Sequence, residues 1–273
     1  MEHAKEHISP EHVESPLAYV LYLRHLRAYE FAGSIIGENC NVLDIGCGEG
    51  YGAAYLANSS PTINITALDV REDSIKHAQN KYPLKNCQYI HYDGHGIPQQ
   101  DSSFDVVLCF QVIEHIKDDY GFISETHRLL KPNGVLIMTT PNKTHRLISW
   151  QKPWNTYHVR EYYPKELVQL CARTFAQVDI KGVFGNEGIQ RLEINRVKSL
   201  KGHRYFLRVV LLGTIMRAIG FFMPKSLKEF FKKLLLRGSQ PVADGCFNYK
   251  TSDYCIKEQL LDESLDLLAI CRK

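Results

Sequence analysis

The stretch Val-Leu-Asp-Ile-Gly-Cys-Gly-Glu-Gly, residues 42–50, decides the fold that this sequence predicts. An apolar run ends there in closely spaced glycines, and residues 51–57 resume with helical character. Glycines let the backbone approach a ligand closely, and the start of a helix offers unpaired N–H groups. The stretch therefore predicts a buried strand, a ligand-binding turn and a helix, in that order.

Two nucleotide cofactors are compatible with this turn. Gly48, Gly50 and Ala53 fit the spacing of the dinucleotide fingerprint, and Asp69 follows at about the distance expected for a carboxylate that binds ribose hydroxyls. An acid at the end of the second strand would bind the ribose of S-adenosylmethionine (SAM) equally well. The turn alone leaves both NAD and SAM open.

Outward from the turn, strand and helix patterns alternate five times within about 100 residues, which predicts a parallel α/β sheet with right-handed crossovers. The expected strands are 41–45, 63–70, 87–92, 104–110, 135–140 and 178–183. The expected helices are 51–57, 74–81, 120–130 and 164–174. A final apolar run at 265–271 is expected to close the sheet at its edge.

The composition is that of an average soluble globular protein. The chain has 273 residues, of which 44% are hydrophobic and 23% charged, and this argues against disorder, a fibrous repeat or a polytopic membrane protein. No basic segment followed by an apolar core opens the sequence, so we expect no signal peptide. The eight cysteines form no C-x-x-C pair, which favours free thiols in a reducing cytoplasm and no metal site.

Four motifs in a fixed order decide between the cofactors. They are the glycine turn, the acid Asp69, the pair Asp93-Gly94, and the run Phe-Asp-Val-Val-Leu-Cys-Phe-Gln-Val-Ile-Glu-His at 104–115 with Leu-Leu-Lys-Pro-Asn-Gly at 129–134. In this order they resemble the class I SAM-dependent methyltransferases, in a type 11-like form. Residues 22–31, 48–52 and 155–161 are similar to methyltransferases of bacterial polysaccharide and glycolipid biosynthesis.

The resemblance implies SAM as the cofactor and a role for each motif residue. Asp44 would orient the turn, the glycines would line the methionine end, Asp69 would bind the ribose, Asp93 the adenine, and the backbone of Gln111 the methionine amino group. Gly50 could instead be a packing glycine, and Asp93 could simply cap a turn. The residues assigned to the cofactor are Asp44, Gly46, Cys47, Gly48, Gly50, Asp69, Val70, Asp93, Gly94 and Gln111.

Two histidines are the candidate catalytic residues. Methyl transfer expels a neutral thioether and needs no acid, but a hydroxyl acceptor benefits from a base. His115 follows the fourth strand, and His158 lies in the aromatic loop 150–163. His115 could instead pack on the cofactor or hold the loop, and His158 could be an exposed loop residue. A phosphate or carboxylate acceptor would need no base.

The domain organisation expected is a Rossmann-like seven-stranded methyltransferase sheet with additions. Residues 1–37 would form an N-terminal helical lid, 38–184 the SAM-binding core, 185–250 a basic helical insert, and 251–273 the final strand or strands of the core.

The insert concentrates the positive charge of the chain. Eleven basic residues and one acid lie between residues 196 and 237, and 225–236 predicts an amphipathic helix. We expect 206–237 either to contact an anionic membrane or to pack on the domain or on a second copy in a homodimer. Nucleic acid is disfavoured because the segment is rich in aliphatic residues.

The function that the sequence predicts is SAM-dependent O-methylation of a sugar or of a glycan- or lipid-linked acceptor. The enzyme would be cytoplasmic, with peripheral contact at the inner face of the membrane as an option. One alternative is methylation of a small metabolite or quinone. Two others belong to different classes, a SAM-binding scaffold without catalysis and an NAD-dependent sugar enzyme. For the last, no Tyr-x-x-x-Lys hydride site is found.

Overall fold

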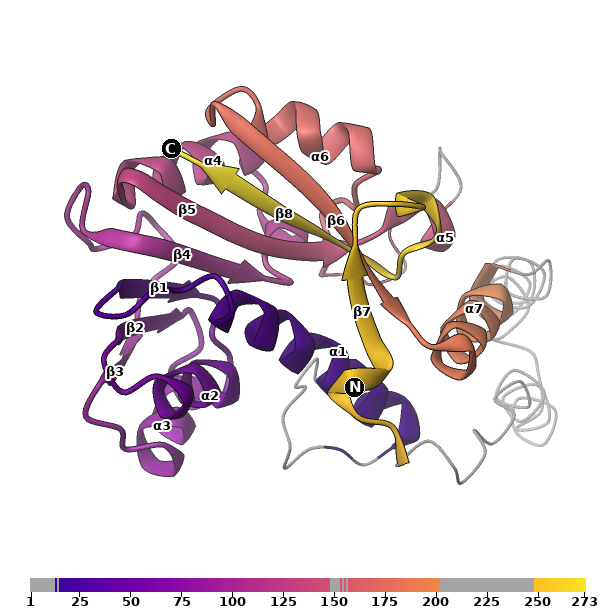
Figure 1. Ribbon diagram of the computed structural model, residues 1–273, viewed down its shortest axis with the longest axis horizontal. Coiled ribbons are helices and arrows are strands. Elements are labelled where there is room, and N and C mark those ends of the chain that lie inside the picture. The colour runs from indigo at the N-terminus through magenta and orange to yellow at the C-terminus, as the bar shows by residue number, and fades with distance from the viewer. Residues whose placement is uncertain (1–12, 14, 148–152, 154, 156, 202–247) are drawn as a thin grey trace, which may run out of the picture.

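An eight-stranded sheet runs through the computed structural model, which describes residues 13, 15–147, 153, 155, 157–201 and 248–273 (Figure 1). The spatial order is β3-β2-β1-β4-β5-β8-β6-β7. The first five of these strands are parallel, and β8 runs antiparallel to both of its neighbours. The strands are β1 (Asn41–Ile45), β2 (Asn64–Asp69), β3 (Cys87–His91), β4 (Phe104–Phe110), β5 (Leu130–Pro141), β6 (Gln177–Gly185), β7 (Tyr254–Lys257) and β8 (Asp266–Arg272).

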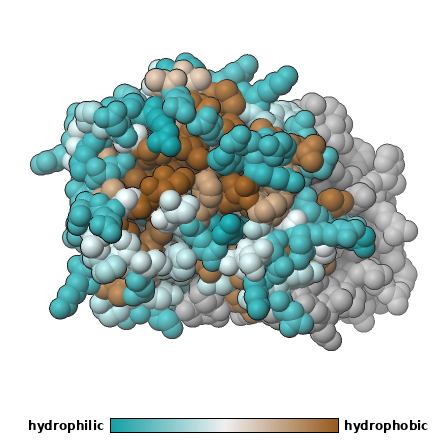
Figure 2. Space-filling view, in the orientation of Figure 1, coloured by the Kyte–Doolittle hydropathy of each residue, from teal (hydrophilic) through white to brown (hydrophobic). Residues whose placement is uncertain are grey.

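Helices cover both faces of the sheet. One apolar cluster joins α1, α2 and α3 to the sheet, and a second joins α4 and α6 to the opposite face. Figure 2 shows an apolar area near the middle of one side of the molecule, surrounded by hydrophilic residues. The helices are α1 (Pro16–Gly33), α2 (Tyr51–Ser59), α3 (Glu72–Lys81), α4 (Asp119–Leu129), α5 (Lys143–Arg146), α6 (Pro164–Cys171) and α7 (Glu187–Lys201), with short 3₁₀ turns η2 (Ile113–His115), η5 (Thr251–Asp253) and η6 (Leu261–Glu263).

The central strands are apolar throughout because both of their faces are buried. In β4, Val106 and Leu108 belong to the α1–α3 cluster, whereas Val107 and Cys109 belong to the α4–α6 cluster. A strand covered on both faces has no polar alternation, and this explains the continuous apolar run in the sequence. The predicted α/β sheet with parallel strands is therefore confirmed.

The end of the chain differs from the prediction in two ways. The sheet has eight strands rather than seven, because β7 adds an antiparallel edge to β6. The apolar run 265–271 does not close the sheet at its edge, since β8 pairs with β5 on one side and β6 on the other. Leu267, Leu268 and Ala269 are fully buried, as an interior strand requires.

The Lys-Pro-Asn-Gly segment, expected as a turn between a helix and a strand, lies within β5. Leu130 pairs with Phe104 and Val135 with Val106, so β5 advances five residues while β4 advances two. Asn133 adopts a positive φ of 65° inside this irregular stretch. The strand therefore begins earlier than its apolar pattern indicates.

The N-terminal helix is part of the core, and the expected lid is not confirmed. Ser15 caps α1 by accepting from the backbone N–H of Ala18 at 3.1 Å. Val20, Leu23 and Ala32 are buried in the same cluster as α2 and α3. Helix α1 therefore packs as a fixed layer against this face of the sheet.

Part of the predicted insert lies outside the described residues. Helix α7 falls within the expected range 185–250, whereas the predicted amphipathic helix 225–236 and the rest of 202–247 are not described. No described helix is long and apolar enough to cross a membrane. The seven cysteines among the described residues are free thiols, as predicted.

Candidate active site

Backbone hydrogen bonds to β2 fix the shape of the glycine turn after β1. The N–H groups of Gly46 and Cys47 both donate to the carbonyl of Leu68 in β2, at 2.7 and 3.0 Å. Gly46 and Gly48 have φ of 76° and 55°, a region that favours glycine. A Cβ at Gly46 would strike Val112, whereas one at Gly48 would meet nothing within 4 Å. The backbone at Gly48 therefore borders open space.

Asp69 joins this turn to the end of β2. Its carboxylate accepts from the backbone N–H of Gly48 at 2.8 Å and from that of Arg71 at 2.9 Å. The side chain is buried. Asp69 therefore lies beside the open backbone of Gly48, where the sequence predicts the ribose.

Val70 and Gly94 lie together at the ends of β2 and β3. Val70 is 53% exposed, and a Cβ at Gly94 would be 3.4 Å from its Cγ1. Asp93 accepts from the backbone N–H of His95 at 2.8 Å, so it caps this turn. An exposed apolar side chain beside a glycine offers a flat surface of the kind that an adenine ring can cover.

Asp44 is the most buried acid of this group, and α1 supplies its partner. Its Oδ2 accepts from the Tyr29 hydroxyl at 3.0 Å, and burial raises the pKa of Asp44 to about 7. Its Oδ1 has no hydrogen-bond partner among the described residues. Tyr29 also packs edge-on against Phe110, with 4.7 Å between ring centroids. The contact between Tyr29 and Asp44 was not expected from the sequence.

The remaining predicted cofactor residues are Gly50, Cys47 and Gln111. A Cβ at Gly50 would lie 2.6 Å from Ala78 and 2.7 Å from Tyr89, so Gly50 is a packing position. Cys47 is buried, and burial raises the pKa of its thiol. Gln111 has a positive φ of 57°, and its side-chain amide donates into the core rather than toward the glycine turn.

These residues fit SAM. Its sulfonium and amino groups carry positive charge, which suits the acid Asp44, and its ribose carries hydroxyls, which suit the carboxylate of Asp69. The open space at Gly48 and the unpaired Oδ1 of Asp44 leave room and an acceptor for a cationic group. Asp69 and the exposed Val70 follow along the same edge of the sheet.

The structure brings the two predicted histidines together. Their rings lie edge to face, with centroids 4.8 Å apart. The Nδ1 of His115 lies 3.1 Å from the carbonyl oxygen of Tyr157, and the Nδ1 of His158 lies 3.0 Å from Oε1 of Glu161. The His158 side chain is only 6% exposed, so it is not a solvent-exposed loop residue.

Glu114 fixes the loop that carries His158. Its carbonyl accepts from the N–H groups of Val159 and Arg160, at 2.7 and 3.3 Å. Its side chain is fully buried, and Oε2 accepts from the Thr140 hydroxyl at 3.0 Å. Burial raises the pKa of Glu114 to about 8. The side chain of Glu114 therefore makes a structural hydrogen bond.

Glu161 and Arg146 form a layer behind His158 that the sequence did not indicate. Arg146 Nε lies 3.1 Å from both carboxylate oxygens of Glu161. Although burial opposes it, His158 and Arg146 hold the pKa of Glu161 below its usual value. His158 thus faces a charged carboxylate that is itself held by an arginine.

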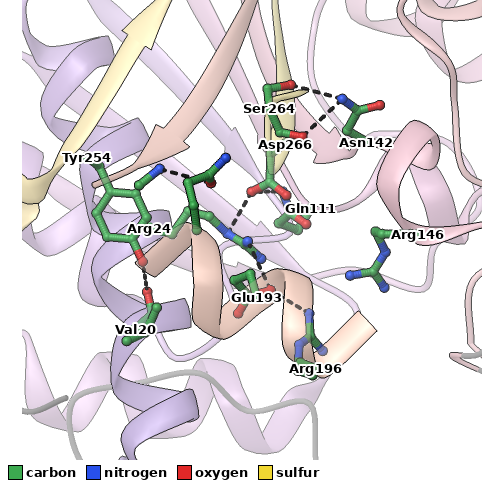
Figure 3. A network of polar contacts seen from close by, with 12 residues as sticks. Val20, Arg24, Gln111, Asn142, Arg146, Glu193, Arg196, Tyr254, Ser264 and Asp266 are labelled. Atoms are coloured by element: carbon green, nitrogen blue, oxygen red, sulfur yellow. Dashed lines mark hydrogen bonds and ion pairs between the residues drawn. The ribbon is translucent and has the colours of Figure 1, made fainter. Parts of the chain in front are cut away.

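A buried ionic network joins α1, α7 and β8 (Figure 3). Arg24 of α1 pairs with Asp266 of β8 at 2.9 Å and with Glu193 of α7 at 3.7 Å, and all three side chains are at most 5% exposed. Gln111 donates to Asp266 at 3.3 Å. A small cavity lies beside this network, lined in part by Arg24, Arg146 and Glu193.

Comparisons with known proteins agree with this geometry. A family model described as a methyltransferase domain matches residues 43–138. A probable S-adenosylmethionine-dependent methyltransferase of Mycolicibacterium smegmatis is 35% identical, over 61% of this chain and just under two thirds (65%) of its own length. One of Mycobacterium tuberculosis is 30% identical, over 84% of this chain and 76% of its own length.

Two further comparisons cover less sequence or only the fold. A ubiquinone biosynthesis O-methyltransferase of Rickettsia typhi is 32% identical, over 53% of this chain and 63% of its own length. A solved SAM-dependent methyltransferase of Thermotoga maritima has 14% identity and a TM-score of 0.56, covering 93% of this chain and 91% of its own.

The chain belongs to the S-adenosylmethionine-dependent methyltransferases. It is an enzyme of this class with a Rossmann-like methyltransferase fold, and S-adenosylmethionine is its cofactor.

Proposed function

We propose that this methyltransferase transfers the methyl group to a hydroxyl oxygen. The observation that carries the proposal is the ring pair of His115 and His158, in which His158 contacts Glu161, at the carboxyl edge of the sheet that also bears the glycine turn. The Rickettsia typhi relative is named an O-methyltransferase, and this supports oxygen as the acceptor atom.

S-adenosylmethionine supplies a methyl group on a positively charged sulfur, and the acceptor oxygen takes the methyl carbon while the sulfur keeps the electron pair of the broken bond. The chain's own residues bind and orient the cofactor and the acceptor. Asp69 and the turn at Gly48 hold the nucleoside side, and Asp44 provides the unpaired oxygen for a cationic group. The carboxylate of Glu161 accepts a hydrogen bond from Nδ1–H of His158. In the neutral imidazole the lone pair then lies on Nε2. A histidine in this state can accept the hydroxyl proton.

We propose a sugar, or a glycan- or lipid-linked hydroxyl, as the acceptor. Its support is the resemblance, noted from the sequence alone, of residues 22–31, 48–52 and 155–161 to methyltransferases of polysaccharide and glycolipid biosynthesis. A quinone or small phenol is the second candidate, favoured by the name of the Rickettsia typhi relative.

The experiment that tests the function is an acceptor panel with methyl-labelled SAM. Sugars, lipid-linked sugars, quinols and amines are each incubated with the full chain, and labelled products are separated and identified. We expect label on an oxygen of one hydroxyl class. Label on nitrogen alone would contradict the O-methylation proposal, and tight SAM binding with no transfer to any acceptor would favour a non-catalytic scaffold.

Replacing Asp69 by alanine is expected to weaken SAM binding by about 1.5–3 kcal/mol, the usual worth of a hydrogen bond to a charged group. Calorimetric titration with SAM measures this loss. The control is Asp101→Ala, which removes an exposed acid paired with Arg128. An affinity equal to that of the unchanged chain would remove Asp69 from the cofactor site.

We also propose that residues 206–237 bring the enzyme to an anionic membrane surface. The support is the excess of lysine and arginine in the sequence, worth about 1 kcal/mol for each basic residue near such a surface. Sedimentation with anionic vesicles at low salt should capture the chain, and neutral vesicles should not. Replacing Lys228, Lys232 and Lys233 by glutamate should abolish capture without changing SAM affinity. Failure of the unchanged chain to sediment would contradict the proposal.

A further inference from the structure

We propose that Glu114, His115 and His158 form a binding site for a divalent transition-metal ion. One carboxylate oxygen and one ring nitrogen from each histidine all lie within 4.8 Å of one another. Two histidines and one glutamate are the ligands of several catalytic zinc sites, in which a further position stays open to water or substrate. The three residues therefore match the chemistry of such a site, and their ligand atoms lie close to the spacing that it requires.

The surroundings of the two histidines are those of metal ligands. Each Nδ1 faces an oxygen that can only accept, the carbonyl of Tyr157 for His115 and the carboxylate of Glu161 for His158. A proton on each Nδ1 satisfies these contacts and places the lone pair on Nε2, the atom that would bind the ion. Metal-binding histidines regularly donate their other N–H to a carboxylate or carbonyl in this way.

The carboxylate of Glu114 gives an independent indication. Its side chain is fully buried, and Oε2 is satisfied by Thr140. Its Oε1 is buried with no hydrogen-bond partner among the described residues. An unsatisfied buried oxygen is costly, and a cation bound between Glu114 and the histidines would remove that cost.

The structure also explains why the sequence shows no metal motif. His158 follows His115 by 43 residues and comes from a separate loop. The loop reaches Glu114 through its own backbone, since Val159 donates to the Glu114 carbonyl. The ligand set exists only once this contact has formed, so ligand spacing along the chain could not reveal it.

An ion at this site would change how the acceptor is activated. A hydroxyl bound at the open position would become more acidic, would lose its proton to water, and would take the methyl group from SAM while the sulfur keeps the electron pair of the broken bond. His115 and His158 would then act as ligands in place of a general base. This consequence rests on the proposed function, whereas binding of the ion does not.

The test uses the full chain, dialysed against a chelator and titrated with Zn²⁺ by calorimetry and with Co²⁺ by visible absorption. We expect one ion per chain and a Co²⁺ spectrum typical of nitrogen and oxygen ligands. His115→Ala and His158→Ala should each weaken binding by more than about 100-fold. Glu161→Gln, which leaves the three ligands unchanged but alters the partner that His158 shares with Arg146, should weaken it by about 10–100-fold.

Two controls keep the test decisive. His127→Ala removes a histidine that packs on Phe175 from α4, and it should leave ion binding unchanged. Glu114→Gln preserves the volume of the glutamate and should weaken ion binding, while SAM binding by each variant shows that it has folded. Absence of stoichiometric binding, or binding by the His115→Ala and His158→Ala variants as tight as by the unchanged chain, would overturn the metal site.

Activity separates this inference from the proposed function. Full turnover on a hydroxyl after removal of the ion would refute the role of the metal and leave O-methylation intact. Ion binding at the three residues with methyl transfer only to nitrogen would support the site and contradict O-methylation.

Discussion

Replacing His158 by alanine is expected to lower turnover on the true acceptor by about 10²- to 10⁴-fold, because it removes a side chain that activates the acceptor hydroxyl, as a proton acceptor or as a ligand of the proposed ion. The affinity for SAM should change little, because the cofactor residues lie at the ends of β1, β2 and β3, whereas His158 is held by Glu114 and Glu161 beyond β4. Saturation kinetics give kcat and KM, and calorimetry gives the SAM affinity. A fall in kcat without a matching rise in KM shows that the lost interaction acts in the transition state.

Glu161→Gln is the informative companion variant. Glutamine keeps the size of the side chain but loses the charge that His158 and Arg146 face. We expect a smaller fall in turnover than for His158→Ala, because the ring remains but is less firmly oriented. Unchanged turnover in both variants would show that positioning alone carries the reaction.

The second large effect concerns stability. Arg24→Met is expected to lower the free energy of unfolding by about 3–5 kcal/mol, the usual result of breaking one side of a buried ion pair. The carboxylates of Asp266 and Glu193 would then be buried without the arginine that lies 2.9 and 3.7 Å from them. Urea denaturation, followed by circular dichroism, measures the loss.

A double-mutant cycle separates the ion pair from simple packing. Arg24→Met combined with Asp266→Leu should cost less than the sum of the two single changes, because the double variant buries one unpaired charge fewer. Arg191→Met on α7 removes an exposed pair with Glu187 and should have no measurable effect. Additive losses in the cycle would show that the network contributes no specific coupling.

The sequence predicted the cofactor half of the fold well, because its signals are local. The glycine turn and Asp69 need only a strand, a turn and the next strand, and adjacent parallel strands place them side by side. The end of the chain was harder to predict. An apolar run such as 265–271 shows that a strand is buried but not which neighbours it has, so β8 was expected at the edge.

On the acceptor side of the site, too, the sequence predicted which residues matter but not which contacts they make. His115 and His158 were recognised as residues of the right chemistry, but their contact depends on a loop that folds back onto Glu114. The partnership of Arg24 with Asp266 joins residues 242 positions apart, and no local pattern encodes it. What the sequence could not predict is therefore mainly the long-range pairing of polar side chains.

The interior position of β8 has a consequence for synthesis of the chain on the ribosome. Strands β5 and β6 are made first, yet each lacks the neighbour of one edge until residues 266–272 appear between them. At about 5–20 residues per second, the delay from the end of β6 to the end of β8 is roughly 4 to 17 s. During that interval the apolar edge of β5 is available to other nascent chains. Slowed translation between residues 185 and 266 should therefore increase aggregation of this enzyme, whereas slowing after residue 272 should not.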